Sequence, residues 1–194
     1  MRILQIYREP LQPGCEAAYA AIESDTARRA AALGCPHPYL GAESIAGPPE
    51  VWWFNSYESA AQRTEVADAY ANNAALMAAL QENSRKKAAL TLAAVDTIAF
   101  FRPDVSVGRP WTLGIGRFLV VAVTNGELSM SGTVFETDAG VRYAIVAAQT
   151  RDAAQEACRA AGTAHPLAVR PQWSFPASEW IAADREFWQP RPDR

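Results

Sequence analysis

The stretch EVWWFNSY at residues 50–57 decides the fold. Its run of aromatic and apolar residues predicts a β-strand, in which successive side chains point to opposite faces of a sheet. One face then carries Val51, Trp53, Asn55 and Tyr57, and the other carries Trp52, Phe54 and Ser56. Trp53 and Tyr57 would form a large exposed aromatic patch if nothing covered them, so a second layer must pack over their face.

The segments around this strand follow a β-α-β-β-α-β order over residues 1–103. Strands are predicted at 3–9, 38–45, 50–57 and 95–102, and helical segments at 16–33, 58–71 and 74–90. The order predicts an α+β fold with a ferredoxin-like βαββαβ antiparallel sheet and its helices on one face. The opposite face of that sheet is left to meet a second sheet, a ligand or water.

Residues 104–116 are predicted to be a linker, and residues 117–194 a second, smaller α+β unit with a C-terminal helix. Strands are predicted at 117–124, 129–137, 141–148 and 167–175, and helices at 150–161 and 178–188. Asn125-Gly126 signals a two-residue turn, and Pro171 favours an edge position for the last strand because it lacks a backbone N–H. The β-β-β-α-β-α order indicates a degenerate ferredoxin-like repeat whose first helix is replaced by a hairpin.

Composition and charge exclude several classes of protein. The 194 residues are 49% hydrophobic, with a net charge of −3, which is typical of a globular protein and not of a disordered chain or a general nucleic-acid binder. No segment approaches the roughly 20 apolar residues of a membrane helix, and the N-terminal apolar run is too short for a signal peptide. The 3 cysteines are widely spaced, which indicates free thiols and a cytoplasmic location. Abundant alanine and arginine suggest a GC-rich bacterial genome.

Three segments resemble the dimeric α/β-barrel superfamily, and within it the antibiotic-biosynthesis-monooxygenase-like and NIPSNAP-like proteins. The segments are LQIYR at 4–8, VWWFNSYES at 51–59 and AYANN at 69–73. The resemblance covers residues 1–103, and a fainter likeness to YCII-like proteins extends over 143–173. It implies two sheets packed face to face around a cavity. Those sheets would come from the two protomers of a homodimer or from one chain as an internal pseudo-dimer.

The resemblance does not choose a chemistry, because the superfamily includes haem proteins, cofactor-free monooxygenases, lyases and proteins of unknown reaction. A haem protein needs an axial ligand, which is usually histidine. Residues 58–90 contain no histidine, so the haem-ligand position of the family is empty in this sequence. We therefore expect no haem and no other cofactor.

The candidate ligand-binding residues follow from the alternation of the strands: Gln5, Tyr7, Trp53, Asn55 and Tyr57. Leu4 and Ile6 are predicted to meet the helices, which leaves Gln5 and Tyr7 on the bare face of the sheet. Aromatic rings together with a few amides are typical of a small-molecule pocket. By resemblance, the Asn55 amide would stabilise a substrate enolate in a cofactor-free monooxygenase. The alternative is that these side chains only fill the interface between two sheets.

The other polar motifs are less specific. His37, between two prolines, is a candidate acid or base at the mouth of the cavity, or else a loop histidine held in place by proline geometry. Cys35 and His37 are too few for a zinc site, so no metal is expected. The run Arg85-Lys86-Lys87 is explained as the solvated end of a helix, where cations complement the helix dipole.

Two functions remain open on the sequence. The first is an enzyme or binding protein for a small aromatic metabolite inside an α/β-barrel cavity, without metal or haem. The second is a non-catalytic dimerisation or accessory module whose sheet faces only bury each other. An enclosed space of a few hundred Å³ lined by Trp53, Asn55 and Tyr57 would favour the first, since ligand pockets measure about 300–1,000 Å³.

Overall fold

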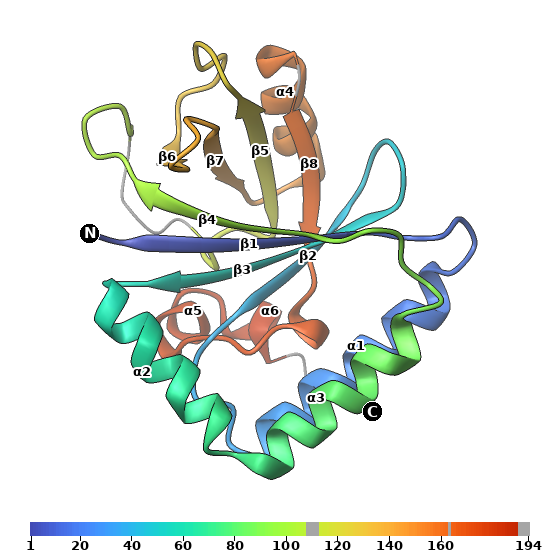
Figure 1. Cartoon of the computed structure of the whole chain (residues 1–194). Coiled ribbons are helices and arrows are strands. Elements are labelled where there is room, and N and C mark those ends of the chain that lie inside the picture. The colour runs from blue at the N-terminus through green and yellow to red at the C-terminus, as the bar shows by residue number, and fades with distance from the viewer. Residues whose placement is uncertain (108–112, 163, 190–194) are drawn as a thin grey trace.

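Antiparallel strands close into a barrel in the order β1-β3-β2-β8-β5-β7-β6-β4 in the computed structural model of the chain (Figure 1). The structure describes residues 1–107, 113–162 and 164–189. The strands are β1 Ile3–Pro10, β2 Leu40–Ser44, β3 Glu50–Tyr57, β4 Val95–Phe101, β5 Phe118–Thr124, β6 Thr133–Glu136, β7 Arg142–Ala148 and β8 Ala164–Val169. The helices are α1 Glu16–Ala32, α2 Ala60–Ala71, α3 Ala74–Lys87, α4 Arg151–Ala161, η1 Pro171–Trp173, α5 Ser178–Ala183 and α6 Arg185–Trp188.

The prediction of an antiparallel α+β fold is confirmed, and the barrel shows what covers the first sheet. Strands β1 to β4 form one half of the barrel, and strands β5 to β8 form the other. Within each half, the fourth strand lies beside the first, followed by the third and the second. The halves join where β2 pairs with β8 and where β4 pairs with β6. The chain therefore covers its own first sheet.

The barrel interior is filled by side chains that the sequence analysis assigned to the helix side. Leu4, Ile6, Trp52 and Phe54 pack in one buried cluster with residues of the second half such as Leu119. Gln5, Tyr7, Trp53, Asn55 and Tyr57 point outward instead, toward α1, α2 and α3. The predicted assignment of the two faces is therefore wrong, although the grouping of residues on each face is right. This largely apolar set suits a closed interior, and its one polar side-chain group, the Trp52 indole N–H, donates a hydrogen bond to Glu50.

Three local predictions for the second half need correction. β8 pairs with both β2 and β5, so it is not an edge strand, and Pro171 lies beyond it in the 3-10 helix η1. β5 pairs with β7 and β8 rather than β6, so Asn125-Gly126 bends the chain without forming a hairpin. The last predicted helix is split into α5 and α6 by Asp184, whose side chain caps α6 by accepting the N–H of Phe187.

Residues of the predicted linker 104–116 pack against the barrel where the structure describes them, although 108–112 lie outside the described residues. The Ser106 hydroxyl accepts a hydrogen bond from the Val134 N–H, and Leu113 is buried in the barrel core. Trp180 and Trp188 of the C-terminal helices join the same core. Among the described residues, no helix is both long enough and apolar enough to cross a membrane.

Candidate functional site

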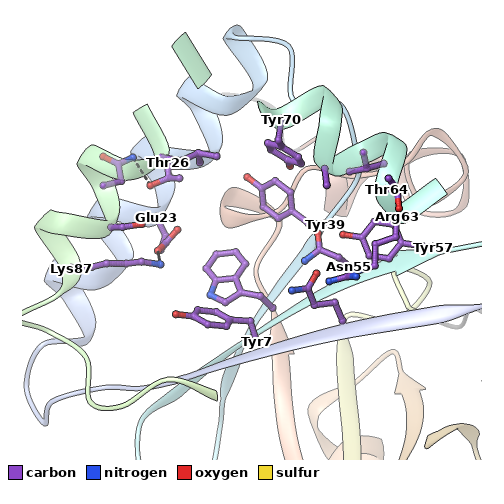
Figure 2. A pocket seen from close by; sticks show the side chains of 17 residues that line it. Tyr7, Glu23, Thr26, Tyr39, Asn55, Tyr57, Arg63, Thr64, Tyr70 and Lys87 are labelled. Atoms are coloured by element: carbon purple, nitrogen blue, oxygen red, sulfur yellow. Dashed lines mark hydrogen bonds and ion pairs between the residues drawn. The ribbon is translucent and has the colours of Figure 1, made fainter. Parts of the chain in front are cut away.

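A cavity of about 600 Å³ lies between the outer face of the first half-barrel and the helices α1, α2 and α3 (Figure 2). It exists because the helices bury few residues against the sheet. In α2 no residue is buried, and in α1 only Tyr19, Glu23, Ala27 and Ala30 are. The alanine-rich helices thus leave space above the strands instead of filling it with large apolar side chains.

Aromatic rings form much of the cavity wall. Tyr7 comes from β1, Trp53 and Tyr57 from β3, Tyr39 from the residue before β2, and Tyr70 from α2. The rings of Tyr39 and Trp53 meet edge to face, with centroids 6.0 Å apart. The Trp53 ring lies over Gly41 of β2, where an added Cβ would come within 2.7 Å of it. A glycine at this position therefore lets the indole lie flat against the sheet.

All five predicted ligand-binding residues line this cavity. The register of β1 and β3 sets Gln5 opposite Asn55 and Tyr7 opposite Trp53, and Tyr57 follows on β3. Their predicted proximity on neighbouring strands is confirmed, whereas the cavity is on the helix side and not between two sheets. That these residues bind a ligand remains a prediction.

The two amides in the cavity differ in their hydrogen bonding. The Gln5 amide nitrogen donates to both carboxylate oxygens of Asp96, each at 3.0 Å. The Asn55 side chain makes no hydrogen bond to any residue that the structure describes, so it is available to a ligand. An amide free to donate and to accept is the polar group on this wall best able to orient a bound molecule.

A buried charged network forms the inner end of the cavity. One oxygen of Glu9, Oε2, accepts hydrogen bonds from the Tyr19 hydroxyl at 2.5 Å, the Trp53 indole N–H at 2.8 Å and the Lys87 ammonium at 2.9 Å. The same ammonium donates to Glu23 Oε1 at 2.6 Å. The side chains of Glu9 and Glu23 are each only 4% exposed, and that of Lys87 is 16% exposed. Two carboxylates therefore share one ammonium in a nearly dry environment.

Burial sets the protonation behaviour of this network. Desolvation raises the pKa of Glu23, and the charge of Lys87 opposes that rise. Desolvation acts to lower the pKa of Lys87, but the charges of Glu23 and Glu9 outweigh it and raise the pKa above its ordinary value. Desolvation also raises the pKa of Tyr7, so its phenol stays protonated at neutral pH. Lys87 is thus a firmly charged group, and burial favours the protonated form of Glu23.

The sequence analysis missed the role of Lys87 and Glu23. The run 85–87 was explained as a solvated helix end, but Lys87 is turned inward and paired with two buried acids. A signal existed in α1, because Tyr19, Glu23, Ala27 and Ala30 recur at helical spacing and form its buried side. An acidic residue on the buried stripe of a helix requires a partner cation, and Lys87 on the neighbouring α3 is that partner.

His37, the other candidate acid or base, does not line the cavity. Its ring stacks on Tyr57 with centroids 4.7 Å apart, and its Nε2 lies 2.8 Å from the Ser56 carbonyl oxygen. A carbonyl only accepts, so Nε2 carries a proton and donates it. Burial lowers the pKa of His37, which favours the neutral ring. His37 therefore packs against the Tyr57 ring from outside the cavity lining.

The described residues that line the cavity lack the side chains that most often bind haem iron, although four of them are tyrosines, which bind it in some proteins. Among the residues that line the cavity in the described part of the chain, none is a histidine, cysteine or methionine. Those are the commonest protein ligands to haem iron. Across the described ranges, no group of three or more histidine, cysteine or acidic residues is placed to hold a metal ion.

Comparisons with known proteins identify the fold. No known family pattern and no curated protein matches the sequence. A protein of Fusobacterium nucleatum, provisionally named a monooxygenase, superposes with a TM-score of 0.54 at 8% identity over 87% of this chain and 92% of its own. The provisionally named chlorite dismutase TA0507 superposes with a TM-score of 0.54 at 8% identity, over 89% of this chain and 96% of its own. An uncharacterised NIPSNAP-like domain protein of Burkholderia xenovorans superposes with a TM-score of 0.42 at 17% identity, over 56% of this chain and 91% of its own. The chain therefore shares its fold with the first two of these proteins, as its sequence resemblance predicted.

Proposed function

We propose that this protein binds a small aromatic metabolite in the cavity between α1, α2, α3 and the outer face of β1 and β3. The observation that carries the proposal is the cavity of about 600 Å³, whose wall combines tyrosine and tryptophan rings with the unpaired amide of Asn55. Ligand pockets of small molecules measure about 300–1,000 Å³ and pair apolar walls with a few orienting polar groups. An accessory module that only buries its sheet faces would have no use for such a space.

The finer proposal concerns chemistry. We propose a monooxygenase-like reaction of a quinol that has lost a proton to solvent, with the Asn55 amide donating a hydrogen bond to the resulting oxyanion. One atom of dioxygen enters the ring and the other leaves as water, and the quinol supplies the electrons as it is oxidised to a hydroxyquinone. Asn55 suits this role because its amide lines the cavity without a hydrogen bond to the residues that the structure describes. Oxygen consumption with a panel of quinols tests it. We expect consumption by the wild type and at least a tenfold loss in Asn55→Ala, since removing one such donor costs about 10²–10³ in rate.

We also propose an origin for the barrel. The fourth-first-third-second strand order in both halves supports two ferredoxin-like units in one chain, the second without its first helix. Such a chain is an internal pseudo-dimer, because it closes by itself the barrel that two protomers would otherwise form. Light scattering tests this, with a monomer expected and an obligate dimer as the contrary result.

Thermal melts test ligand binding directly. A ligand present at 100 times its Kd stabilises the folded state by about 2.7 kcal/mol, which for a protein of this size raises Tm by about 5–11 °C. We expect that rise for at least one member of a panel of small aromatic acids and quinols. It should be reduced in Asn55→Ala and retained in Asn125→Ala, whose asparagine is exposed in a loop far along the chain. No shift with any member would contradict the proposal.

A further inference from the structure

The cavity is lined by different charges at its two ends. Figure 2 shows Glu23, Thr26 and Lys87 on one side, and Arg63, Thr64 and Tyr57 on the other, with Tyr7 and Tyr39 between them. The first group comes from α1 and α3, and Arg63 comes from α2. A ligand long enough to span the aromatic middle would meet a different environment at each end.

The inner end carries more negative than positive charge. Lys87 is its one cation among the described residues, and it is already shared between the carboxylates of Glu9 and Glu23. Glu9 Oε2 accepts three hydrogen bonds, whereas the ammonium of Lys87 is the donor that reaches Glu23 Oε1. A ligand anion here would be repelled by two buried carboxylates. A hydroxyl would instead donate a hydrogen bond to Glu23, and bonds to charged acceptors are about twice as strong as neutral ones.

The opposite end carries a cation that has no ion-pair partner among the described residues. Arg63 is exposed on α2, and no carboxylate of the described chain lies within ion-pair distance of it. Its side chain lines the cavity on the same side as Tyr57 (Figure 2). Burial raises the pKa of Tyr57, the charge of Arg63 opposes that rise, and the charge of Asp96, which is hydrogen-bonded to Gln5, adds to it. An arginine fork with no partner matches the geometry of a carboxylate.

We infer that the ligand is a hydroxylated aromatic acid. Its hydroxyl donates a hydrogen bond to Glu23 at the inner end, and its carboxylate lies beside Arg63 at the outer end. The inference rests on the proposed function, since it assigns the substrate class of that same cavity. Lys87 acts as a positioning residue that holds the Glu23 carboxylate toward the cavity.

Isothermal titration calorimetry with three probes tests the inference on the full chain. The probes are 3-(4-hydroxyphenyl)propionate, 3-phenylpropionate without the hydroxyl, and 4-ethylphenol without the carboxylate. In the wild type, we expect loss of the hydroxyl to raise Kd about tenfold or more, as for a hydrogen bond to a charged group. Loss of the carboxylate should raise Kd about two- to fivefold, as for an exposed ion pair.

Variants then assign each effect to one residue. In Glu23→Gln the penalty for the missing hydroxyl should shrink to less than about threefold, and in Arg63→Gln the penalty for the missing carboxylate should vanish. Glu16→Gln, exposed on the same helix as Glu23, and Arg151→Gln, exposed on α4, serve as controls that keep both penalties. The comparison of probes in the wild type stands even if a variant folds poorly.

The possible failures are distinguishable. Equal affinity for all three probes would overturn the inference and leave the proposed aromatic site standing. Tighter binding of 3-phenylpropionate to Glu23→Gln, with no effect of Arg63→Gln, would show the anion at the inner end and would also overturn it. If no probe binds the wild type, both the inference and the proposed function fail.

Discussion

Replacing Lys87 with methionine removes the ammonium that pairs with both Glu9 and Glu23. Methionine keeps an unbranched side chain that can lie near the Tyr19 and Trp53 rings, whose centroids are 5.3 and 5.6 Å from the Lys87 nitrogen. The change therefore tests the charge more than the packing. Removing one partner of a buried ion pair costs about 3–5 kcal/mol, because the remaining charge stays buried without compensation.

The expected effect on melting is large and depends on pH. For a chain of this size, about 3–5 kcal/mol corresponds to a fall in Tm of about 6–20 °C at neutral pH. Burial raises the pKa of Glu23 and Lys87 opposes the rise, so the pKa should climb further without Lys87. A raised carboxyl pKa destabilises the folded state at pH above that pKa. The deficit should therefore shrink as the pH falls toward the unfolded-state value of about 4.3.

Calorimetric melts between pH 4 and pH 8 are the assay, at about 0.15 M salt to screen surface charges. Lys86→Met is the matched control, because Lys86 is the preceding residue, is 48% exposed and pairs with the exposed Glu82. It should lose no more than about 0.5 kcal/mol. The double change Lys87→Met with Glu23→Gln should recover part of the loss. If the single variant Lys87→Met melts at the same temperature as Lys86→Met at every pH, the reasoning is refuted.

Three further predictions follow from other contacts. Gly41→Ala should cost about 1–3 kcal/mol in denaturant unfolding, because the added Cβ would come within 2.7 Å of the Trp53 ring. Gly126→Ala, whose Cβ would make an ordinary contact with the Thr124 hydroxyl at 3.7 Å, should change stability by under about 0.5 kcal/mol. Asn55→Ala should leave Tm within about 2 °C of the wild type while weakening ligands, since the amide has no partner among described residues. His37 should titrate by NMR below its usual value of about 6.5, because burial lowers its pKa; a value above 6.5 would contradict its burial.

Much of the fold could be predicted because local signals agree with it. The strand at 50–57 is observed at Glu50–Tyr57, and the helix capped by Thr150 is observed at Arg151–Ala161. The Thr150 side chain accepts the Ala153 N–H, as an N-cap should. The local sequence gives weaker signals for pairings between strands that are far apart in the chain. Pro171 favoured an edge position for the last predicted strand, but closure of the barrel gives β8 a partner on both sides.

The sequence predicts one wall of the candidate site but not its charged end. Alternation sorts side chains into two faces, which is why Gln5, Tyr7, Trp53, Asn55 and Tyr57 fall on one wall. It does not tell which face meets the helices when both faces carry aromatic rings. The helical spacing of α1 indicates that Glu23 is buried, but no local pattern identifies its partner, because Lys87 lies 64 positions from Glu23 and 78 from Glu9.

A crystal structure with 3-(4-hydroxyphenyl)propionate bound would test the central claim most directly. The account predicts electron density for the ring between α1, α2 and the outer face of β3, beside Tyr39 and Trp53. The barrel interior, filled by Leu4, Ile6, Trp52 and Phe54, should remain closed to the ligand. Density for the ring inside the barrel, or on the surface with the cavity left to solvent, would contradict it.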